Sequence, residues 1–359
     1  MTNDSPSIFA SSKIIAHQER IDAYLKGKNI YPITVELDLT QCCTRSCHSC
    51  PYSVARAQGK TLQLPFLEKL FAILGPNTPG LVLSGGEATF APHFPETVKL
   101  AREKGFKEIA VISNGTRLDI TEVQNALLEF VTSVRISIYD WQEGDSESFI
   151  ATLRRIERLR KRIEQEGSSL EIGAAMLTRT DWISRLKPVG LQVLQAGVDW
   201  LYFHPFCVDW ETYRPVQANQ SGVLEAIEDL KKVAPAGSNI QVPVERYLLR
   251  PLYFENLHGS HFLIQVGADG INYAGPECKY HPEYALLDLN EYLEQDFLWQ
   301  EKRLCRLREI NSDNYRVIGT KHRPPVFSDF IERLIQAKKW SVENTPAIVH
   351  TNFLYPDIV

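Results

Sequence analysis

The most constraining feature of this sequence is a short segment that holds three regularly spaced cysteines. The segment reads T-Q-C-C-T-R-S-C-H-S-C-P-Y, and Cys43, Cys47 and Cys50 give it the spacing C-x3-C-x2-C. Thiolates are soft ligands that select iron–sulfur clusters or zinc, among a few other metals. A cubane [4Fe-4S] cluster held by three cysteines has one iron without a protein ligand. Three cysteines therefore favour a site that does chemistry at the open iron over one that only passes electrons.

A structural zinc site is the alternative interpretation of the same segment. Structural zinc is almost always tetrahedral, so Cys42 or His48 would have to supply the fourth ligand. In the iron–sulfur interpretation, Cys42 falls outside the spacing and is a packed thiol.

The composition is that of an ordinary globular protein in a reducing compartment. The chain has 359 residues and a net charge of −5, which fits one large or two modest domains and gives no basic field for nucleic acid. Four of the seven cysteines lie between Cys42 and Cys50, which is a metal pattern and not a disulfide framework. No apolar run is long enough to span a bilayer, and Met1 to Ser12 lack a secretory pattern. We therefore expect a cytoplasmic protein with neither a membrane nor a nucleic-acid partner.

Strand-like and helical segments alternate from residue 33 onward. An alternating strand over 33–39 comes directly before the cysteines. Five further strands are predicted over 81–84, 108–113, 134–139, 170–177 and 199–204, and helices over 64–74, 94–104, 120–130, 149–165 and 183–196. This alternation predicts an α/β fold with a parallel sheet, a partial (β/α)6 barrel. Because such barrels build active sites at the C-terminal ends of their strands, the cysteines lie where an active site is expected.

Four short segments, in order, resemble the radical S-adenosylmethionine (radical SAM) enzymes. The first is the cysteine spacing just after the first strand. The others are Leu83-Ser84-Gly85-Gly86-Glu87, like the family's G-G-E segment, Ser113-Asn114-Gly115-Thr116, like its T-N-G-T turn, and Arg135-Ile136-Ser137-Ile138-Tyr139, like its S-[IL]-D strand. Each motif is weak alone, but four in the expected order make a strong signal. The resemblance implies a radical SAM core barrel over 31–205, after a lead-in over 1–30 and before a smaller α+β extension over 206–359.

The resemblance also implies the cofactors and one partner. A [4Fe-4S] cluster would be held by Cys43, Cys47 and Cys50, and the amino and carboxylate groups of S-adenosylmethionine would chelate the open iron. An external one-electron reductant of the flavodoxin or ferredoxin type would supply the electron. The family usually has an aromatic residue just before the third cysteine, whereas this sequence has Ser49, whose main chain would still meet the adenine.

The later motifs supply the other residues that the resemblance assigns to S-adenosylmethionine. Gly85 and Gly86 would bind the methionyl ammonium group, with Glu87 nearby. Asn114 and Ser137 would contact the ribose and the carboxylate, and Arg179 is a further candidate for the carboxylate. Each assignment has an ordinary alternative. Gly85 and Gly86 could form a plain strand-to-helix turn, and Asn114 a plain Asn-Gly turn. Ser137 could be a buried strand hydroxyl, and Arg179 a solvated surface arginine.

The extension contains a segment that resembles the hairpin opening the SPASM and twitch extensions of this superfamily. It runs from Asp269 to Cys278, and strands over 262–266 and 271–273 are predicted around it, followed by a helix over 287–307. Only Cys207, Cys278 and Cys305 remain as thiol ligands there, so we do not expect an auxiliary cluster. Cys207 and Cys278 are candidate hydrogen-atom donors to a substrate radical, with a packed apolar thiol as the alternative.

The sequence thus predicts a radical SAM enzyme that cleaves S-adenosylmethionine reductively and abstracts a substrate hydrogen atom with a 5′-deoxyadenosyl radical. The expected substrate is a peptide or a small molecule such as a sugar or another natural product, which is modified by epimerisation, oxidation or bond formation. The competing hypothesis is a non-catalytic zinc or iron–sulfur protein with a structural or electron-transfer site.

Overall fold

The computed structural model describes residues 11–47, 50, 58–139, 141, 146–206, 208–209, 214–215, 221–247, 251–315, 323–338 and 355–359. Its main element is a ten-stranded sheet with the order β12-β11-β10-β1-β2-β3-β4-β5-β6-β9. Six strands of this sheet follow the chain in order and are parallel: β1 (Thr34–Thr40), β2 (Gly80–Gly85), β3 (Glu108–Ser113), β4 (Ser133–Ser137), β5 (Glu171–Thr178) and β6 (Trp200–Pro205). The six predicted strands and their parallel order are confirmed.

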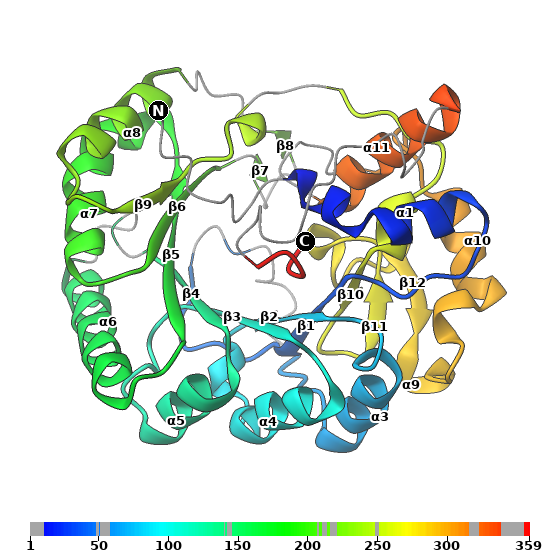
Figure 1. The fold of residues 1–359 in the computed structure, drawn as a ribbon, viewed down its shortest axis with the longest axis horizontal. Helices are drawn as coiled ribbons and strands as arrows, with labels where there is room; N and C mark the ends of the chain where they lie inside the picture. Colours follow the sequence, from blue (N-terminus) through cyan, green and yellow to red (C-terminus); the bar gives the residue numbers. More distant parts are fainter. Residues whose placement is uncertain are drawn as a thin grey trace.

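Helices cover the outer side of this curved sheet, as Figure 1 shows. They are α3 (Leu64–Leu74), α4 (Phe94–Lys104), α5 (Thr121–Phe130), α6 (Ser146–Glu166), α7 (Ile183–Gln195) and α8 (Ser221–Val233). The strands meet them with alternate side chains: Val35, Leu37 and Leu39 of β1 belong to the main hydrophobic core. Glu36 and Asp38, which alternate with them, therefore face the inner, concave side of the sheet.

Strands from the C-terminal part of the chain extend the same sheet at both edges. β9 (Asn239–Gln241) pairs in parallel with β6, and β10 (Leu263–Val266) pairs in parallel with β1. β11 (Ile271–Tyr273) and β12 (Ala285–Asp288) continue from β10 in antiparallel order. The predicted hairpin is confirmed as β10 and β11. A separate two-stranded sheet is formed by β7 (Val208–Asp209) and β8 (Arg214–Pro215).

The single helix predicted over 287–307 is wrong. The chain instead ends β12 at Asp288 and forms three separate helical pieces: α9 (Leu289–Tyr292), a 3-10 turn over Phe297–Trp299, and α10 (Glu301–Glu309). Leu289, Leu293 and Phe297 give the segment its helical spacing and all lie in the main core. They reach it through two short helical pieces, because the backbone is extended at Gln300 and starts a new helix there.

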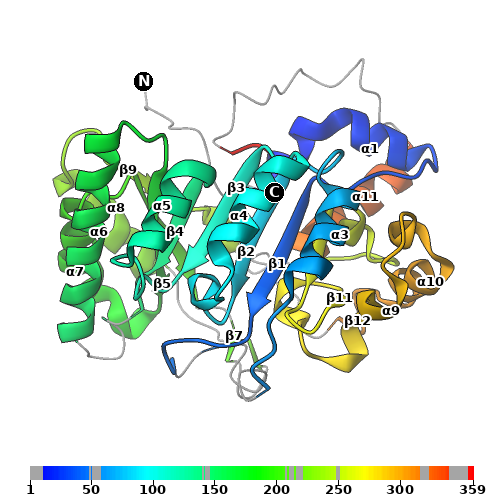
Figure 2. The same cartoon turned by 90° about the horizontal axis from the view of Figure 1, so that it is seen from below.

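A short segment, residues 355–359, lies across the ends at which the strands begin. Thr34 Oγ1 donates to the Asp357 carbonyl at 2.7 Å, and the Asp357 amide donates to Glu108 Oε2 at 2.9 Å. Trp200 Nε1 donates to Tyr355 Oη at 3.4 Å. Thr34, Glu108 and Trp200 are the first residues of β1, β3 and β6. Figure 1 shows this segment inside the curve of the sheet, and Figure 2 shows it opposite the end toward which β1 points.

Two further helices, α1 (Gln18–Leu25) and α11 (Arg323–Ala337), pack together beside this end of the sheet. Ile14, Ile21 and Phe327 share a small hydrophobic cluster there. Lys13, which is fully buried, donates from Nζ to the Tyr355 carbonyl at 2.6 Å and to the Ile358 carbonyl at 3.0 Å. The N-terminal and C-terminal segments therefore hold each other in place over the strand starts.

Candidate functional site

The cysteine segment follows β1 directly, at the C-terminal end of the strand. Cys43, Cys47 and Cys50 are each half-buried, and the Cys50 amide donates to the Cys47 carbonyl at 3.3 Å. The segment has the donors that an iron–sulfur cluster needs, because three thiols stand on one loop at the mouth of the sheet. Among the residues that the structure describes, no three His, Cys, Asp or Glu side chains are gathered closely enough to hold a metal ion. His48 and Ser49 of the same segment lie outside the described residues.

The residues that the alternative zinc site would use are only partly described. Cys42 is half-exposed, and its Sγ lies 3.6 Å from the Gly59 carbonyl oxygen, to which it donates. Its backbone carbonyl, by contrast, accepts from the Glu87 amide at 2.9 Å. The backbone of Cys42 thus supports the neighbouring turn, while its thiol is directed to Gly59.

Gly85 and Gly86 end β2 beside this segment and allow the two backbones to approach closely. Gly85 has a φ of +124°, which side chains rarely permit. A Cβ on Gly86 would lie 2.3 Å from the Cys42 carbonyl oxygen, which is far inside van der Waals contact. The Gly86 amide donates to the Thr40 carbonyl at 2.8 Å. Glycine is therefore required here by the packing of the turn against the cysteine segment.

Glu87 is buried and ties two of the predicted motifs together. Its Oε1 accepts from Ser113 Oγ at 2.9 Å and from Thr89 Oγ1 at 2.6 Å, and its Oε2 accepts from the Asn114 amide at 2.7 Å. Burial raises the pKa of Glu87, while the hydrogen bonds from Asn114, Thr89 and Ser113 act against that rise. The carboxylate thus binds protein donors from β3 and from its own turn, and its role toward S-adenosylmethionine stays a prediction.

Asn114 connects the third motif to the cysteine segment. Its Nδ2 donates to Thr44 Oγ1 at 3.0 Å and lies 3.5 Å from Cys43 Sγ. Its Oδ1 accepts from the Thr116 amide at 3.0 Å, and Thr116 Oγ1 is 2.6 Å from Thr44 Oγ1. The Asn-Gly turn that the sequence offered as an alternative is present, and the same side chain also contacts a predicted cluster ligand. Thr44 and Thr116 are site residues that the sequence reasoning missed.

Ser137 and Arg179 follow the next two strands. Ser137 is the last residue of β4 and is half-buried, and it hydrogen-bonds to Tyr139, whose pKa is raised by burial. Arg179 comes directly after β5 and donates from Nε to Asp181 Oδ1 at 2.9 Å. Its guanidinium carbon lies 4.9 Å from the centre of the Trp182 ring. Both residues therefore stand at C-terminal strand ends, and their contacts with S-adenosylmethionine stay predictions.

The inner face of β1 carries a buried ionic network that the sequence reasoning missed. Asp38 is fully buried, and its Oδ1 accepts from Lys279 Nζ at 2.6 Å and from Ser84 Oγ at 2.7 Å. Its Oδ2 accepts from Tyr280 Oη at 2.8 Å, and Lys279 Nζ also donates to Glu36 Oε1 at 3.1 Å. The segment after β11 is thereby fixed to the inner face of the barrel.

The cysteines of the extension lie in different surroundings. Cys278 is fully buried in a second hydrophobic cluster with Phe254 and Tyr315, and burial raises the pKa of its thiol well above the ordinary value. Cys305 is on α10, where its Sγ donates to Glu301 Oε1 at 3.1 Å. Cys207 lies outside the described residues. The hydrogen-atom donor role of Cys207 and Cys278 stays a prediction, as does the expected absence of an auxiliary cluster.

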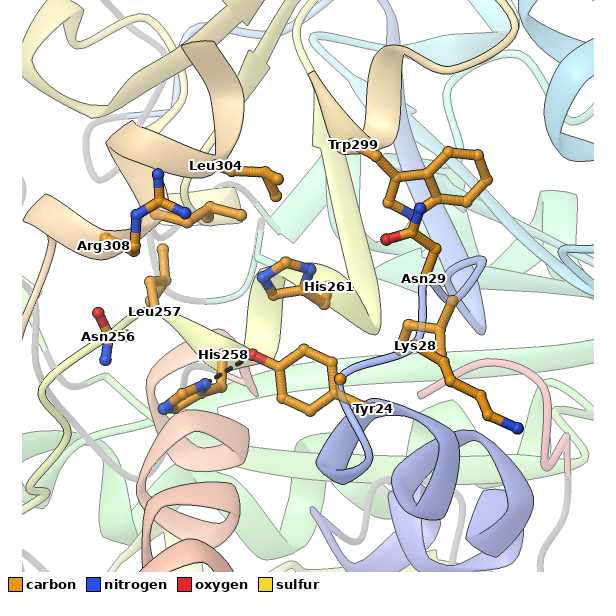
Figure 3. A pocket seen from close by; sticks show the side chains of 13 residues that line it. Tyr24, Lys28, Asn29, Asn256, Leu257, His258, His261, Trp299, Leu304 and Arg308 are labelled. Carbon is orange, nitrogen blue, oxygen red and sulfur yellow. Dashed lines mark hydrogen bonds between the residues drawn. The ribbon is translucent and has the colours of Figure 1, made fainter. Parts of the chain in front are cut away.

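A separate cavity of about 310 Å³ lies between α1, α10 and the segment 256–261. Tyr24 Oη is 2.7 Å from His258 Nδ1, and His258 Nε2 is 3.2 Å from Glu332 Oε2. Figure 3 shows these two rings together, with His261 near the centre of the lining side chains. Burial lowers the pKa of His261 well below its ordinary value, so this imidazole is neutral at pH 7. None of the predicted site residues lines this cavity.

Helix length and hydropathy were also compared with what a bilayer requires. None of the helices in the described part of the chain is long and apolar enough to cross a membrane.

Parts of this chain are similar to known proteins. A 91-residue segment is 32% identical to the 7,8-dihydro-6-hydroxymethylpterin dimethyltransferase of Methanocaldococcus jannaschii, and the match covers 24% of this chain and 18% of that enzyme. The chain thus spans under a fifth of the length of that relative. Among solved structures, Streptococcus suis SuiB has a TM-score of 0.61 at 10% identity, covering 81% of this chain and 72% of SuiB.

A second solved structure, native anSMEcpe with bound AdoMet and Kp18Cys peptide, has a TM-score of 0.56 at 13% identity. This likeness covers 85% of the chain and 98% of anSMEcpe. At such identities the two structures show a shared fold. Residues 37–173 match the sequence pattern of a protein family, the Radical SAM superfamily. This region holds the cysteines and the three later motifs. The resemblance to the radical SAM enzymes that the four motifs indicated is thus supported by a family match over part of this chain.

Proposed function

We propose that this protein is an enzyme that cleaves S-adenosylmethionine by radical chemistry and uses the product radical to abstract a hydrogen atom from a substrate. The observation that carries the proposal is the position of the C-x3-C-x2-C segment within the matched family region. It leaves β1 at its C-terminal end and is hydrogen-bonded to the turns after β2 and β3. The family match over residues 37–173 supports the cleavage itself, and the roles of the individual residues are proposed from their positions.

The cluster and the cosubstrate have separate sets of residues in this proposal. Cys43, Cys47 and Cys50 would hold a [4Fe-4S] cluster, whose chemistry is to pass one electron to S-adenosylmethionine so that methionine and a 5′-deoxyadenosyl radical form. The backbone at Gly85 and Gly86 would receive the methionyl ammonium group. Asn114, Ser137 and Arg179 would orient the ribose and the carboxylate, and the main chain of Ser49 would meet the adenine. A flavodoxin or ferredoxin would deliver the electron.

The contribution of the protein is orientation and the exclusion of water. Asn114 lies between the cysteine segment and Glu87, so it fixes the distance between the residues that bind the cluster and those that bind the cosubstrate. The outer face of the strands is sealed by the main core, and the ends at which the strands begin are closed by residues 355–359. Substrate would therefore enter from the end where the cysteines lie.

For the substrate class, we propose a peptide or a small natural product, to be modified by epimerisation, oxidation or bond formation. Two of the structural neighbours are described with peptides: SuiB bound to precursor peptide SuiA, and anSMEcpe with Kp18Cys peptide. These neighbours favour peptides as the first substrates to test. Cys278 and Cys207 are proposed as hydrogen-atom donors, and their replacement by alanine would change the product of an epimerisation.

The first test is anaerobic reconstitution of the protein with iron and sulfide. We expect a brown protein with bound iron and sulfide that forms 5′-deoxyadenosine and methionine from S-adenosylmethionine under dithionite. Replacing Cys43, Cys47 or Cys50 by alanine should abolish cluster binding and product formation. Cys305→Ala is the matched control, because this thiol lies on α10 beside Glu301, and it should retain both properties.

The opposite outcome identifies the competing hypothesis. A colourless protein that binds one zinc ion and gives no cleavage would show a structural site, in which Cys42 or His48 completes the ligands. An iron–sulfur protein that is brown but inactive toward S-adenosylmethionine would show an electron-transfer site. Either result would remove the catalytic proposal.

A further inference from the structure

Three arginines from distant parts of the chain meet on the inner face of the barrel. The first is Arg135, in the middle of β4. Its neighbours Val134 and Ile136 lie in the main core, so Arg135 faces the concave side. Two residues further along, at about 3.3 Å per residue, the same strand ends at Ser137, beside the cysteine segment. Arg135 is therefore one layer below the proposed site of S-adenosylmethionine.

The second is Arg246, which comes from the short helix after β9. Its Nη1 donates to the hydroxyl of Tyr202, and its guanidinium carbon is 5.8 Å from the centre of the Tyr202 ring. Tyr202 faces the concave side because its neighbours Leu201 and Phe203 lie in the main core. Its ring stacks on that of His204 at 4.9 Å. Arg246 is thus on the concave side of the sheet, against β6.

The third is Arg323, the first residue of α11. Its charge interacts with those of Arg246 and Arg135, and also with Tyr202 and Glu36. Burial and, after it, repulsion by Arg246 and Arg135 lower the pKa of Arg323 to about 9, while Tyr202 and Glu36 oppose that change. The pKa of Lys13 is likewise lowered, first by burial and then by Arg323. Such effects act only between nearby charges, so Arg323 lies near both Arg246 and Arg135.

The carboxylates of the same face compensate these charges only in part, because Glu36 is the one that opposes the lowered pKa of Arg323. Asp38 and Glu36 both accept from Lys279, at 2.6 Å and 3.1 Å. Within the described ranges, neither Arg135 nor Arg323 forms a hydrogen bond or an ion pair, and Arg135 Nε is shielded from water without a partner. Enclosing several cations around one carboxylate that is already paired with Lys279 is costly, and the amino end of α11 adds a further positive potential beside Arg323.

We propose that Arg135, Arg246 and Arg323 bind an oxyanion of the substrate, a carboxylate or a phosphate, inside the barrel. The inference rests on the proposed function and adds the substrate class to it: an anionic molecule whose charged group is held below the cosubstrate. Guanidinium groups match both anions because their N–H donors form a planar fork. The reacting carbon would then lie between the anion and the cysteine end.

Binding of simple anions to the reconstituted protein tests the proposal directly. Two calorimetric titrations are used, one with inorganic phosphate as a probe for a phosphate group and one with succinate as a probe for a carboxylate. We expect at least one of them to bind, and Arg135→Gln and Arg323→Gln each to weaken that binding about tenfold or more. Arg135→Lys should restore part of it. Arg158→Gln is the matched control, since Arg158 is an exposed residue of α6 that pairs with Asp119, and it should change nothing.

Thermal unfolding adds a measurement that does not depend on the affinity of the probe. Removing one of several clustered cations relieves repulsion, so Arg135→Gln and Arg323→Gln should leave the melting temperature unchanged or raise it. Phosphate or succinate should raise the melting temperature of the wild type more than that of either variant. If both substitutions lower the melting temperature and neither anion stabilises the wild type, the arginines are structural and the proposal is overturned.

The test separates this inference from the proposed function. Slow formation of 5′-deoxyadenosine without substrate should persist in Arg135→Gln and Arg323→Gln, because neither residue is assigned to the cosubstrate. Equal anion binding by wild type and variants, with that reaction intact, would overturn the inference alone. Loss of the reaction in the wild type would overturn the proposed function, whatever the anion titrations show.

Discussion

The two ends of the barrel are built from the same strands and differ in almost every physical respect. At the end where the strands finish, Cys43, Cys47 and Cys50 are half-buried and the loop depends on side-chain contacts such as that of Asn114 with Thr44. At the end where they start, Lys13 is fully buried and its ammonium group is bound by main-chain carbonyls of residues 355–359.

The difference teaches where each kind of change should act. A barrel that concentrates ligand-binding groups at one end must obtain its stability from the other end and from the outer core. At the cysteine end, substitutions should remove chemistry and leave the fold. At the closed end, substitutions should destabilise the fold, while the molecules that remain folded should keep their activity.

The largest effect on stability is expected for Tyr355→Ala. This side chain is 7% exposed and packs with Trp200 and Tyr202 on the inner face, so its removal leaves a cavity. The cost in the free energy of unfolding should be about 3–5 kcal/mol, as for other buried aromatic residues. Denaturant unfolding of the apoprotein measures it, with Tyr253→Ala as the control.

Tyr253 is a suitable control because its side chain is 50% exposed and its hydroxyl donates to Glu255, while its backbone amide, which alanine keeps, donates to Asp329. Its replacement should change the free energy of unfolding by less than about 0.5 kcal/mol. Equal effects of the two substitutions would mean that residues 355–359 do not support the closed end. Tyr355→Ala should also keep the rate of S-adenosylmethionine cleavage per folded molecule, whereas a loss comparable to that of the cysteine variants would break the comparison.

Sequence reasoning was most successful where the signal is local. The six parallel strands were predicted because each has an alternating or continuous apolar run, such as Val35, Leu37 and Leu39 before the cysteines. The position of the cysteine segment follows from that strand alone. The resemblance to the radical SAM enzymes was predicted from four motifs in order, and the family match over residues 37–173 confirms that resemblance.

What the sequence did not reveal depends on contacts between distant segments. β9 and β10 join the sheet at its two edges, and nothing local in them specifies which strand they pair with. Residues 355–359 form a single turn whose role comes entirely from the strand starts that they cover. One signal was present and missed: Glu36 and Asp38 alternate with core residues in β1, which places two acids on the inner face.

A smaller effect on stability, together with a loss of activity, is expected for Glu87→Gln. The amide cannot reproduce a carboxylate that accepts from Ser113 and Asn114 on different oxygens, because one of its atoms is a donor. The free energy of unfolding should fall by about 1–3 kcal/mol, and cleavage of S-adenosylmethionine should slow because the turns after β2 and β3 lose their connection. Glu103→Gln, an exposed change on α4 beside Lys99, is the control and should alter neither quantity. An unchanged stability with a lost activity would instead show direct contact of Glu87 with the cosubstrate.

The last effect is a pH dependence at the closed end, from Glu108. Burial raises the pKa of Glu108 to about 7, and the charge of Asp357 acts in the same direction, opposed by Lys13. Because the folded state holds this proton up to a higher pH than the unfolded chain, its stabilising contribution is complete below about pH 4.5 and is lost as the pH rises to about 7. The histidines of the separate cavity, His258 and His261, have lowered pKa values and give the opposite slope in part of the same range, so the difference between wild type and Glu108→Gln is the quantity to measure. That difference in the free energy of unfolding should change between pH 4.5 and 7 and be constant above pH 7. A difference that does not change with pH would instead place Glu108 in contact with solvent. The closed end would then be open to water.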